Sequence, residues 1–414
     1  MKIFCETVSS GGVKETKIFG GLIKKIKTSQ KKEITVCGKR VYFQRRGSLV
    51  PKRTHPEIPL SKQVSHFSAF TYGNAGDNIL VKALQRSLDV VSGRENIYNE
   101  KHVHDEVDST TLKEINQTRA VIVGGGGLFL QDTNPNKISG WQWLCSEKMM
   151  EAITVPLIVL AVGYNRFRGQ DDFAPVFREN INKLVERSAF FGLRNSGSIR
   201  AIRNYLREDL RDKVAFHPCP TTILAKLYSM PEKKAERPFV AINCAFDRSE
   251  KRFASNKEKL LKEIAQVAKG LSADYAIKYY VHVETDKEIL PVFEQEGVSC
   301  EVVVLEGLRD EQTFLDVYSS PSLVIGMRGH SQMIPFGCRT PILSIVSHEK
   351  MKWFLEDISH PEWGVDITEP DFGAALNMTA RKILENPEIV TRQITESQEI
   401  FWQATKKNIA GLKL

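Results

Sequence analysis

The chain has 414 residues, of which 42% are hydrophobic and 26% charged, and its formal net charge is +8. This length exceeds that of a usual single domain of about 100 to 200 residues, so we expect two domains. No apolar run approaches the roughly 18 residues that cross a bilayer, and the start, MKIFCETVSSGG, lacks the apolar core of a signal peptide. The seven cysteines form no C-x-x-C pair, which favours reduced thiols and a cytosolic protein.

Residues 1–60 form a basic leader with 14 Lys and Arg against 4 Glu. Within it, IFGGLIKKIKTSQKK spaces apolar residues and lysines as in a helix lying on a membrane surface. The stretch EITVCGKRVYFQRRG then indicates a hairpin with its turn at Cys37–Lys39. Membrane contact, a mobile basic arm and an extra layer on the first domain all stay open for this leader. Nucleic acid is disfavoured, because aromatic residues do not interleave with the charges.

From residue 64, short apolar runs alternate with amphipathic segments, which is typical of a parallel sheet flanked by helices. The expected strands are VSHFSAF, NIYNEKHV, AVIVGG, PLIVLAVG, SAFFGLR and KVAFHP. The expected helices cover residues 76–90, 109–117, 139–152, 173–188 and 196–208. We interpret residues 61–230 as one doubly wound domain.

The charged stretch MPEKKAERP, residues 230–238, is bracketed by prolines and indicates an interdomain linker. After it the alternation resumes with the expected strands FVAINCAF, YAIKYYVHV, CEVVVLE, LVIGM and PILSIV. Helices are expected at 255–271, 285–296, 309–319, after Gly329 and at 348–358. Residues 231–370 are thus predicted to form a second domain of the same kind, and residues 371–414 two helices that pack back toward the first.

Open parallel sheets bind ligands beyond the carboxyl ends of their strands, so the motifs that follow predicted strands are candidates for a site. In YGNAGDN, Gly73 and Gly76 permit a tight turn, while Asn74 and Asp77 can cap the next helix and present its free N–H groups. Such turns also occur without a ligand, so this motif alone leaves function open.

VIVGGGGLFLQD contains four consecutive glycines. Because glycine has no side chain, a ligand or another segment of the chain can approach the backbone closely at this point. The dinucleotide fingerprint G-x-G-x-x-G fails, because its third glycine falls on Phe129 or Leu130. A turn contacting phosphate or sugar through Gly125, Gly126 and Gly127 fits the pattern. A close crossing of strand and helix fits it equally well.

Basic residues follow three of the predicted strands. Arg194 ends the strand in FGLRNSGS, Arg328 and His330 follow the strand in VIGMRGH, and Lys350 lies beyond the next strand in SHEK. Because neighbouring strand ends share one edge of a sheet, we expect these side chains to face one cleft. Their concentrated positive charge predicts an anionic ligand.

These motifs resemble the polysaccharide pyruvyl transferase family, which has GNAGDN, GGGGLFLQD, LRNSGS, MRGH and the lysine of SHEK in the same order. The resemblance implies an α/β fold of two Rossmann-like doubly wound domains facing a cleft, as in GT-B glycosyltransferases. It implies phosphoenolpyruvate as donor and, as acceptor, a sugar of a cell-surface polysaccharide or its lipid-linked precursor, with no metal or other cofactor. The leader lies outside the resemblance, and Cys219 stands where many relatives have an aspartate.

By position, the resemblance implies that Arg194, Arg328 and Lys350 bind the carboxylate and phosphate of the donor, with further substrate contacts from Asn74 and Gly125–Gly127. His330 suits proton transfer to the donor methylene or binding of its phosphate, and these two roles stay open. Asp77 is the candidate base for an acceptor hydroxyl.

Two other functions stay under consideration. A glycosyltransferase using a nucleotide sugar would share the cleft and the basic phosphate site, and Glu306 or Asp310 could then bind the ribose. A catalytically idle glycan-binding protein is the other, although the set of basic residues at strand ends speaks against it.

Overall fold

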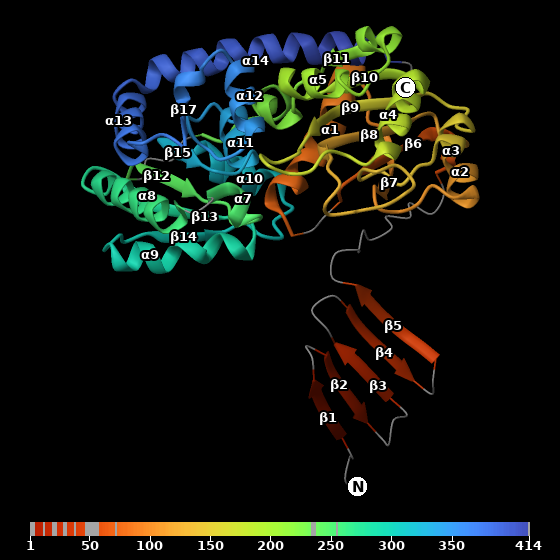
Figure 1. Ribbon diagram of the computed structural model, residues 1–414, viewed down its shortest axis with the longest axis horizontal. Helices are drawn as coiled ribbons and strands as arrows, with labels where there is room; N and C mark the ends of the chain where they lie inside the picture. Colours follow the sequence, from red (N-terminus) through yellow and green to blue (C-terminus); the bar gives the residue numbers. More distant parts are fainter. Residues whose placement is uncertain are drawn as a thin grey trace.

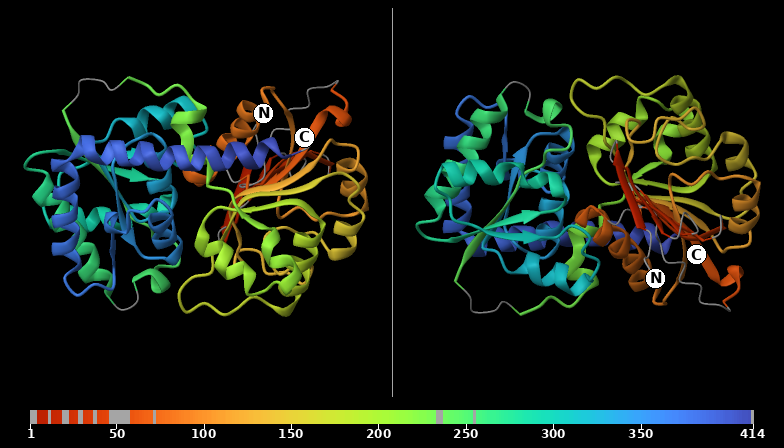
Figure 2. Two further views of the ribbon diagram at one scale, coloured as in Figure 1. Left: turned by 90° about the horizontal axis from the view of Figure 1, so that it is seen from above. Right: turned by 90° about the horizontal axis from the view of Figure 1, so that it is seen from below.

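The computed structural model describes the strands within residues 5–45 and the chain from residue 58 to residue 412, except residues 71–72, 233–236 and 254–255. The described strands form one five-stranded sheet and two six-stranded sheets (Figure 1). The two six-stranded sheets are parallel throughout and carry helices on their faces (Figure 2). The predicted fold class of two doubly wound α/β domains is therefore confirmed.

The first parallel sheet has the order β11-β10-β9-β8-β6-β7. Its strands are β6 (Gln63–Ser68), β7 (Ile97–His102), β8 (Val121–Phe129), β9 (Leu157–Tyr164), β10 (Ser188–Leu193) and β11 (Val214–Phe216). The helices that connect them are α1 (Ala75–Ser92), α2 (Ser109–Ile115), α3 (Glu147–Glu151), α4 (Pro175–Arg187) and α5 (Ser196–Arg203), and α6 (Leu224–Leu227) follows the sheet. The strand order reverses between β6 and β8, which makes the ends of these two strands the expected ligand position.

The second parallel sheet has the Rossmann strand order, β14-β13-β12-β15-β16-β17, and reverses between β12 and β15. Its strands are β12 (Phe239–Asn243), β13 (Ala276–Val281), β14 (Glu301–Val304), β15 (Leu323–Gly326), β16 (Ile342–Val346) and β17 (Gly364–Asp366). Its helices are α7 (Ser249–Phe253), α8 (Lys257–Leu271), α9 (Leu290–Gln295), α10 (Glu311–Ser319), α11 (His330–Gly337) and α12 (Glu349–Asp357). The central strands are buried along their whole length, as a sheet covered on both faces requires.

Two helices, α13 (Phe372–Glu385) and α14 (Pro387–Ala410), end the described chain. Figure 2 shows α14 running along both parallel sheets. Its Gln398 side chain donates to the carbonyl of Phe336 in α11, and its Asn408 side chain donates to the carbonyl of Phe216 in β11 at 2.8 Å. The helix thus ties the second sheet to the first. The exact domain boundaries stay a prediction.

The interfacial helix predicted in the leader is wrong. The described residues there form an antiparallel sheet of β1 (Cys5–Ser10), β2 (Val13–Ile18), β3 (Ile23–Lys27), β4 (Lys31–Val36) and β5 (Lys39–Arg45). The recurrent Val, Ile and Thr of these segments favour strands, and the two glycines at 20–21 disfavour a helix. The predicted hairpin is confirmed by the pairing of β4 with β5, and its turn lies outside the described residues.

The helix predicted at 139–152 is wrong over its first half, because only Glu147–Glu151 is helical. The Asn136 side chain accepts hydrogen bonds from the N–H groups of Ile138, Ser139 and Gly140, which gives this backbone partners other than a helix. Trp141 and Trp143 are then buried in the core of the first sheet. Within the described part of the chain, no helix combines the length and the hydropathy that a membrane crossing requires.

The close contact between α11 and the turn at Pro220–Ile223 yields a test of the packing. A methyl group at Gly337 would overlap the carbonyl oxygen of Thr221, so Gly337→Ala is expected to lower the free energy of unfolding by about 1–3 kcal/mol. Gly270→Ala on the exposed face of α8 meets only Asn377 at 3.9 Å and serves as the control, with a gain of about 0.5–1 kcal/mol. Equal urea midpoints for the two variants would contradict this packing.

Candidate active site

Apart from Gly125–Gly127, the predicted site residues follow the carboxyl ends of strands in the two parallel sheets. Asn74 and Asp77 follow β6, Arg194 follows β10, His330 follows β15 and Lys350 follows β16. These ends include the reversal points of both sheets, where an open α/β sheet exposes room for a ligand. The electrostatic interactions described below bring Arg194, His330 and Lys350 together at one site.

Arg194 is a buried cation that forms no ion pair with the residues that the structure describes. Its residue is only 7% exposed, and its side chain has no hydrogen bond or ion pair with any residue that the structure describes. The guanidinium lies against Gly163 of β9, where a Cβ atom would overlap its Nε. Burial lowers the pKa of Arg194, while Cys219 and Asp77 oppose that shift. The protein therefore holds a guanidinium whose buried Nε has no hydrogen-bond partner among the described residues.

Lys350 lies in the first turn of α12, and its ammonium group donates to the Asn165 side-chain oxygen at 2.8 Å. Among the described residues no carboxylate lies within ion-pair distance of it. Burial, followed by the charges of Arg252 and Arg194, holds the pKa of Lys350 well below its ordinary value. Asn165 follows β9 and lies against Gly127, where a Cβ atom would come within 2.9 Å of its side-chain nitrogen.

His330 begins α11, and its side chain is 12% exposed. Its Nδ1 lies 3.9 Å from Oδ1 of Asp77, and its buried Nε2 has no hydrogen-bond partner among the described residues. Burial, followed by Arg194 and Lys350, holds the pKa of His330 well below its ordinary value. The ligand-free site therefore disfavours the protonated imidazole. Gly76 in α1 gives it room, since a Cβ atom there would lie 2.5 Å from the ring.

Arg328 lies in the same strand-end region, but two carboxylates already occupy it. Its Nη1 is 2.9 Å from Asp247, and its Nε and Nη2 lie 2.9 Å and 2.5 Å from Asp286. The Arg328 side chain is 10% exposed and that of Asp286 is fully buried. Arg328 was predicted to bind the donor, but the charge of its guanidinium is already neutralised by these two aspartates.

The remaining predicted residues have structural contacts of their own. Asn74 is the N-cap of α1 and accepts from the N–H of Gly76 at 3.0 Å. The four glycines belong to β8 instead of a loop, and Gly125 and Gly126 have φ of 76° and 118°. Of the three glycines predicted to bind substrate, Gly127 contacts a residue of the site, Asn165, whereas Gly125 and Gly126 face Leu80 of the core.

Four residues near the site were missed by the sequence reasoning: Phe167 after β9, and Asp247, Arg248 and Arg252 after β12. The Phe167 ring centroid lies 4.7 Å from the Arg248 guanidinium and 5.1 Å from that of Arg252, and 5.8 Å from the Lys350 ammonium. Such contacts between cations and an aromatic face are favourable. Both segments directly follow predicted strands, so the strand-end rule applied above would have found them.

Ion pairs join the two halves of the chain beside this site. Arg248 binds Asp132 through two hydrogen bonds of 2.6 Å and 2.7 Å. Arg168 binds Glu349 at 2.7 Å and Asp366 at 2.8 Å. Each pair links a segment that follows a strand of the first sheet to the second half of the chain, so the pairs join the two halves beside the site.

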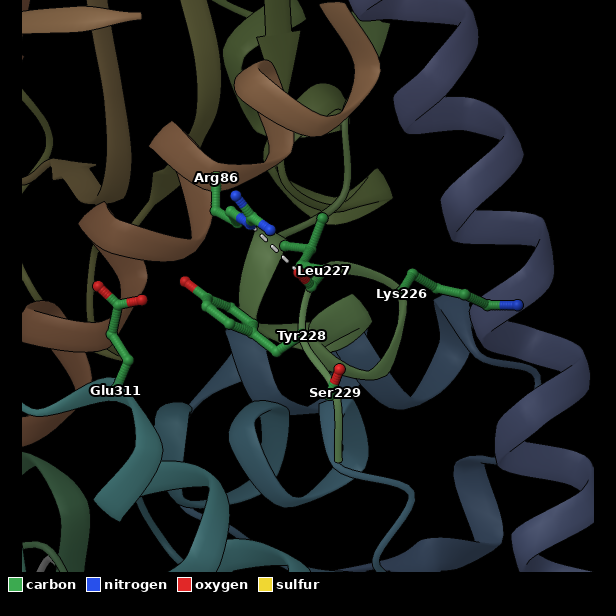
Figure 3. A pocket seen from close by; sticks show the side chains of 6 residues that line it. All are labelled: Arg86, Lys226, Leu227, Tyr228, Ser229 and Glu311. Atoms are coloured by element: carbon green, nitrogen blue, oxygen red, sulfur yellow. Dashed lines mark hydrogen bonds between the residues drawn. The ribbon is translucent and has the colours of Figure 1, made fainter. Parts of the chain in front are cut away.

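A pocket of about 470 Å³ lies elsewhere, between α1, α6 and α10 (Figure 3). It is lined by Arg86, Lys226, Leu227, Tyr228, Ser229 and Glu311. In Figure 3 the Lys226 side chain points away from Arg86 and Glu311, and it pairs with Glu399 of α14 at 2.5 Å. The pocket shares no lining residue with the strand-end site. We assign the chemistry to the strand ends, because the unpaired cations and the histidine are there.

Two doubly wound sheets with a buried cationic site between their strand ends define a two-domain protein of the Rossmann-like α/β class. A family model described as polysaccharide pyruvyl transferase matches residues 74–349, which is more than half of the chain. The chain therefore belongs to the polysaccharide pyruvyl transferase family. Membership supports a transferase that acts in polysaccharide modification.

Comparisons with other proteins add the following similarities. No curated protein matches the chain. Solved structures similar to it include S. aureus MnaA with UDP, at 14% identity over 81% of this chain and 91% of that one, with a TM-score of 0.48. A putative UDP-N-acetylglucosamine 2-epimerase from Listeria monocytogenes has 12% identity over 83% and 91%, with a TM-score of 0.49. The pneumococcal O-GlcNAc transferase GtfA, in complex with UDP and GlcNAc, has 12% identity over 99% and 81%, with a TM-score of 0.45.

The unpaired burial of Arg194 predicts a gain in stability when the charge is removed. Arg194→Met should raise the free energy of unfolding of the ligand-free protein by about 1–3 kcal/mol, because a buried cation without a partner is replaced by an apolar chain of similar length. Arg200→Met, whose side chain is 61% exposed and pairs with Glu356, is the control and should change it by less than about 0.5 kcal/mol. A clear loss of stability in Arg194→Met would show that this guanidinium has a partner.

Proposed function

We propose that the protein transfers pyruvate from phosphoenolpyruvate to a sugar of a cell-surface polysaccharide or its lipid-linked precursor, where it forms a ketal, and releases phosphate. One observation carries this proposal: Arg194 is buried and Lys350 partly buried, neither has an ion pair with a carboxylate among the described residues, and both act electrostatically on the same histidine. A small acid with several negative charges, such as phosphoenolpyruvate, would supply the missing counter-charge.

The reaction requires a proton, two hydroxyls and a leaving phosphate. Protonation of the donor methylene places positive character on the adjacent carbon, and one acceptor hydroxyl attacks that carbon with loss of its own proton. Phosphate then leaves, and a second hydroxyl closes the ketal ring and loses a proton. Cations that hold the carboxylate and the phosphate stabilise the departing negative charge. In this scheme Arg194 and Lys350 have that role.

His330 is our candidate for the proton donor. In the ligand-free protein burial and the neighbouring cations depress its pKa. A bound phosphate would cancel much of that positive field and raise the pKa, so that the imidazole gains a proton where the donor needs one. Asp77, whose carboxylate faces the same imidazole, is our candidate base for an acceptor hydroxyl. The helix cap at Asn74 and the backbone of Gly125–Gly127 are proposed to complete the substrate contacts.

A nucleotide-sugar transferase fits the geometry less well. Asp310, one of the two acids that could bind a ribose, caps α10 by accepting from the Thr313 N–H at 2.8 Å and from its hydroxyl at 2.6 Å. These bonds lower the pKa of the Asp310 carboxyl and engage one of its two oxygens in the helix cap. A non-catalytic glycan-binding protein would have no use for a histidine held between two unpaired cations.

The direct test of the proposed reaction is phosphoenolpyruvate-dependent release of phosphate in the presence of acceptor glycans. His330→Ala and Lys350→Ala should lower the rate by about 100-fold or more, because each removes a group that acts on the transferring atoms. Lys352→Ala, on the exposed face of α12, is the matched control and should retain the wild-type rate. Release of a nucleotide from a nucleotide sugar, with none from phosphoenolpyruvate, would contradict the proposal.

We also propose that residues 1–60 bring the protein to the inner face of an anionic membrane, where lipid-linked acceptors lie. The proposal rests on the charge of this segment, 14 Lys and Arg against 4 Glu, and on the near-neutral balance of the remaining chain. Each basic residue near an anionic surface contributes about 1 kcal/mol. In this proposal the antiparallel sheet, and not the predicted helix, carries the basic side chains to the membrane surface.

Removal of residues 1–60 should therefore weaken binding to vesicles that contain anionic lipid, measured by co-sedimentation at low and high salt. The full chain should bind these vesicles more weakly as salt rises, and neutral vesicles should bind neither form. Undiminished binding of the shortened chain to anionic vesicles would mean that the leader has another task.

A further inference from the structure

The guanidinium of Arg328 is the centre of a buried ionic network. All three of its nitrogens face carboxylates, with Nη1 on Asp247 and with Nε and Nη2 on Asp286. Asp286 also accepts from the Asn243 side chain at 3.2 Å and from the N–H of His282 at 3.0 Å. These contacts fix Arg328 to the ends of β12 and β13 as well as to its own strand, β15.

The network continues through Asp247 toward the segment that carries Lys350. Asp247 accepts from Nη2 of Arg252 at 3.0 Å, and Nη1 of Arg252 donates to the hydroxyl of Ser347 at 2.9 Å. Although burial alone would raise it, the charges of Arg252, Arg328 and Lys350 hold the pKa of Asp247 below its ordinary value. Two aspartates and two arginines thus connect four strand ends of the second sheet, those of β13, β15, β12 and β16.

The backbone around Arg328 is fixed as firmly as its side chain. The Ser331 hydroxyl accepts from the N–H of Arg328 at 3.1 Å and donates to its carbonyl at 2.7 Å. The Gln332 side chain donates to the carbonyl of Gly326 at 2.6 Å. His330 lies inside this short segment, two residues after Arg328. A shift of the Arg328 anchor would therefore move the imidazole.

We infer that Arg328 is a positioning residue, held by Asp286 and Asp247, which sets the place of His330 and does not bind the donor. The inference rests on the proposed function and changes the role that the sequence predicts for this arginine. Its basis is the contrast with Arg194, whose buried Nε has no partner among the described residues, since an arginine already bound to two carboxylates gains little from a third anion. Anion binding then falls to Arg194 and Lys350.

Steady-state kinetics with phosphoenolpyruvate separate the two roles. Asp247→Asn and Asp286→Asn break the anchor from the carboxylate side and leave Arg328 in place. We expect each to lower kcat by about 100-fold while KM for phosphoenolpyruvate stays within about twofold, because a displaced imidazole slows the chemistry without weakening donor binding. Arg328→Met should have the same effect. Arg194→Met is the contrasting variant and should raise KM.

Inorganic phosphate supplies a readout that needs neither phosphoenolpyruvate nor turnover. Phosphate should raise the melting temperature of the wild type, because a ligand that binds only the folded protein stabilises it. Asp247→Asn and Arg328→Met should retain this rise, whereas Arg194→Met should lose it. Asp247, whose side chain is 33% exposed, gives a variant that is expected to fold if Arg328→Met does not.

The outcomes distinguish this inference from the function on which it rests. A raised KM and a lost phosphate effect in Arg328→Met, with near-normal kcat in Asp247→Asn and Asp286→Asn, would show that Arg328 binds the donor and would overturn the inference alone. A wild type that neither responds to phosphate nor consumes phosphoenolpyruvate would overturn both proposals.

Discussion

The site depends on positive charge that is held away from water and forms no ion pair with the described residues. A cation removed from water loses much of its solvation energy, and a protein holds one there only when the surrounding fold is stable enough to offset that cost. At this site Arg194 lies on the bare backbone of Gly163, and the Lys350 ammonium faces a neutral amide, Asn165. The depressed pKa values of Lys350 and His330 follow first from burial and then from the neighbouring positive charges. An anion is the ligand that such a site favours most.

Around Arg194 and Lys350 lie other arginines that are paired with carboxylates. Arg328 and Arg252 are neutralised by Asp286 and Asp247, and the pairs of Arg248 and Arg168 join the first sheet to the second. The paired arginines therefore hold the site together, whereas Arg194 and Lys350 remain available to a substrate. This division arises from the fold, because both sheets place their reversal points and strand ends at the same interface.

Much of this arrangement could be predicted from the sequence. Alternating apolar runs gave both parallel sheets, and the strand-end rule indicated Arg194, His330 and Lys350. The state of Arg328 could not be predicted, because its partner Asp286 lies 42 residues away and only the fold brings the two together. The two wrong helix predictions have local causes. Before α3, the Asn136 side chain accepts hydrogen bonds from backbone N–H groups that a helix would use. In the leader, β-branched residues favour paired strands.

The central claim is that an anion enters a site in which burial and neighbouring cations hold the pKa values of Lys350 and His330 below their ordinary values. Calorimetric titration of phosphoenolpyruvate at about pH 8, where a phosphate monoester is already ionised, tests it when repeated in buffers of different ionisation enthalpy. Our account predicts net proton uptake, up to about one proton per site, as the pKa of Lys350 rises toward its ordinary range, whereas His330, whose ordinary pKa is about 6.5, takes up little at this pH. Binding without proton uptake, or with proton release, would contradict it.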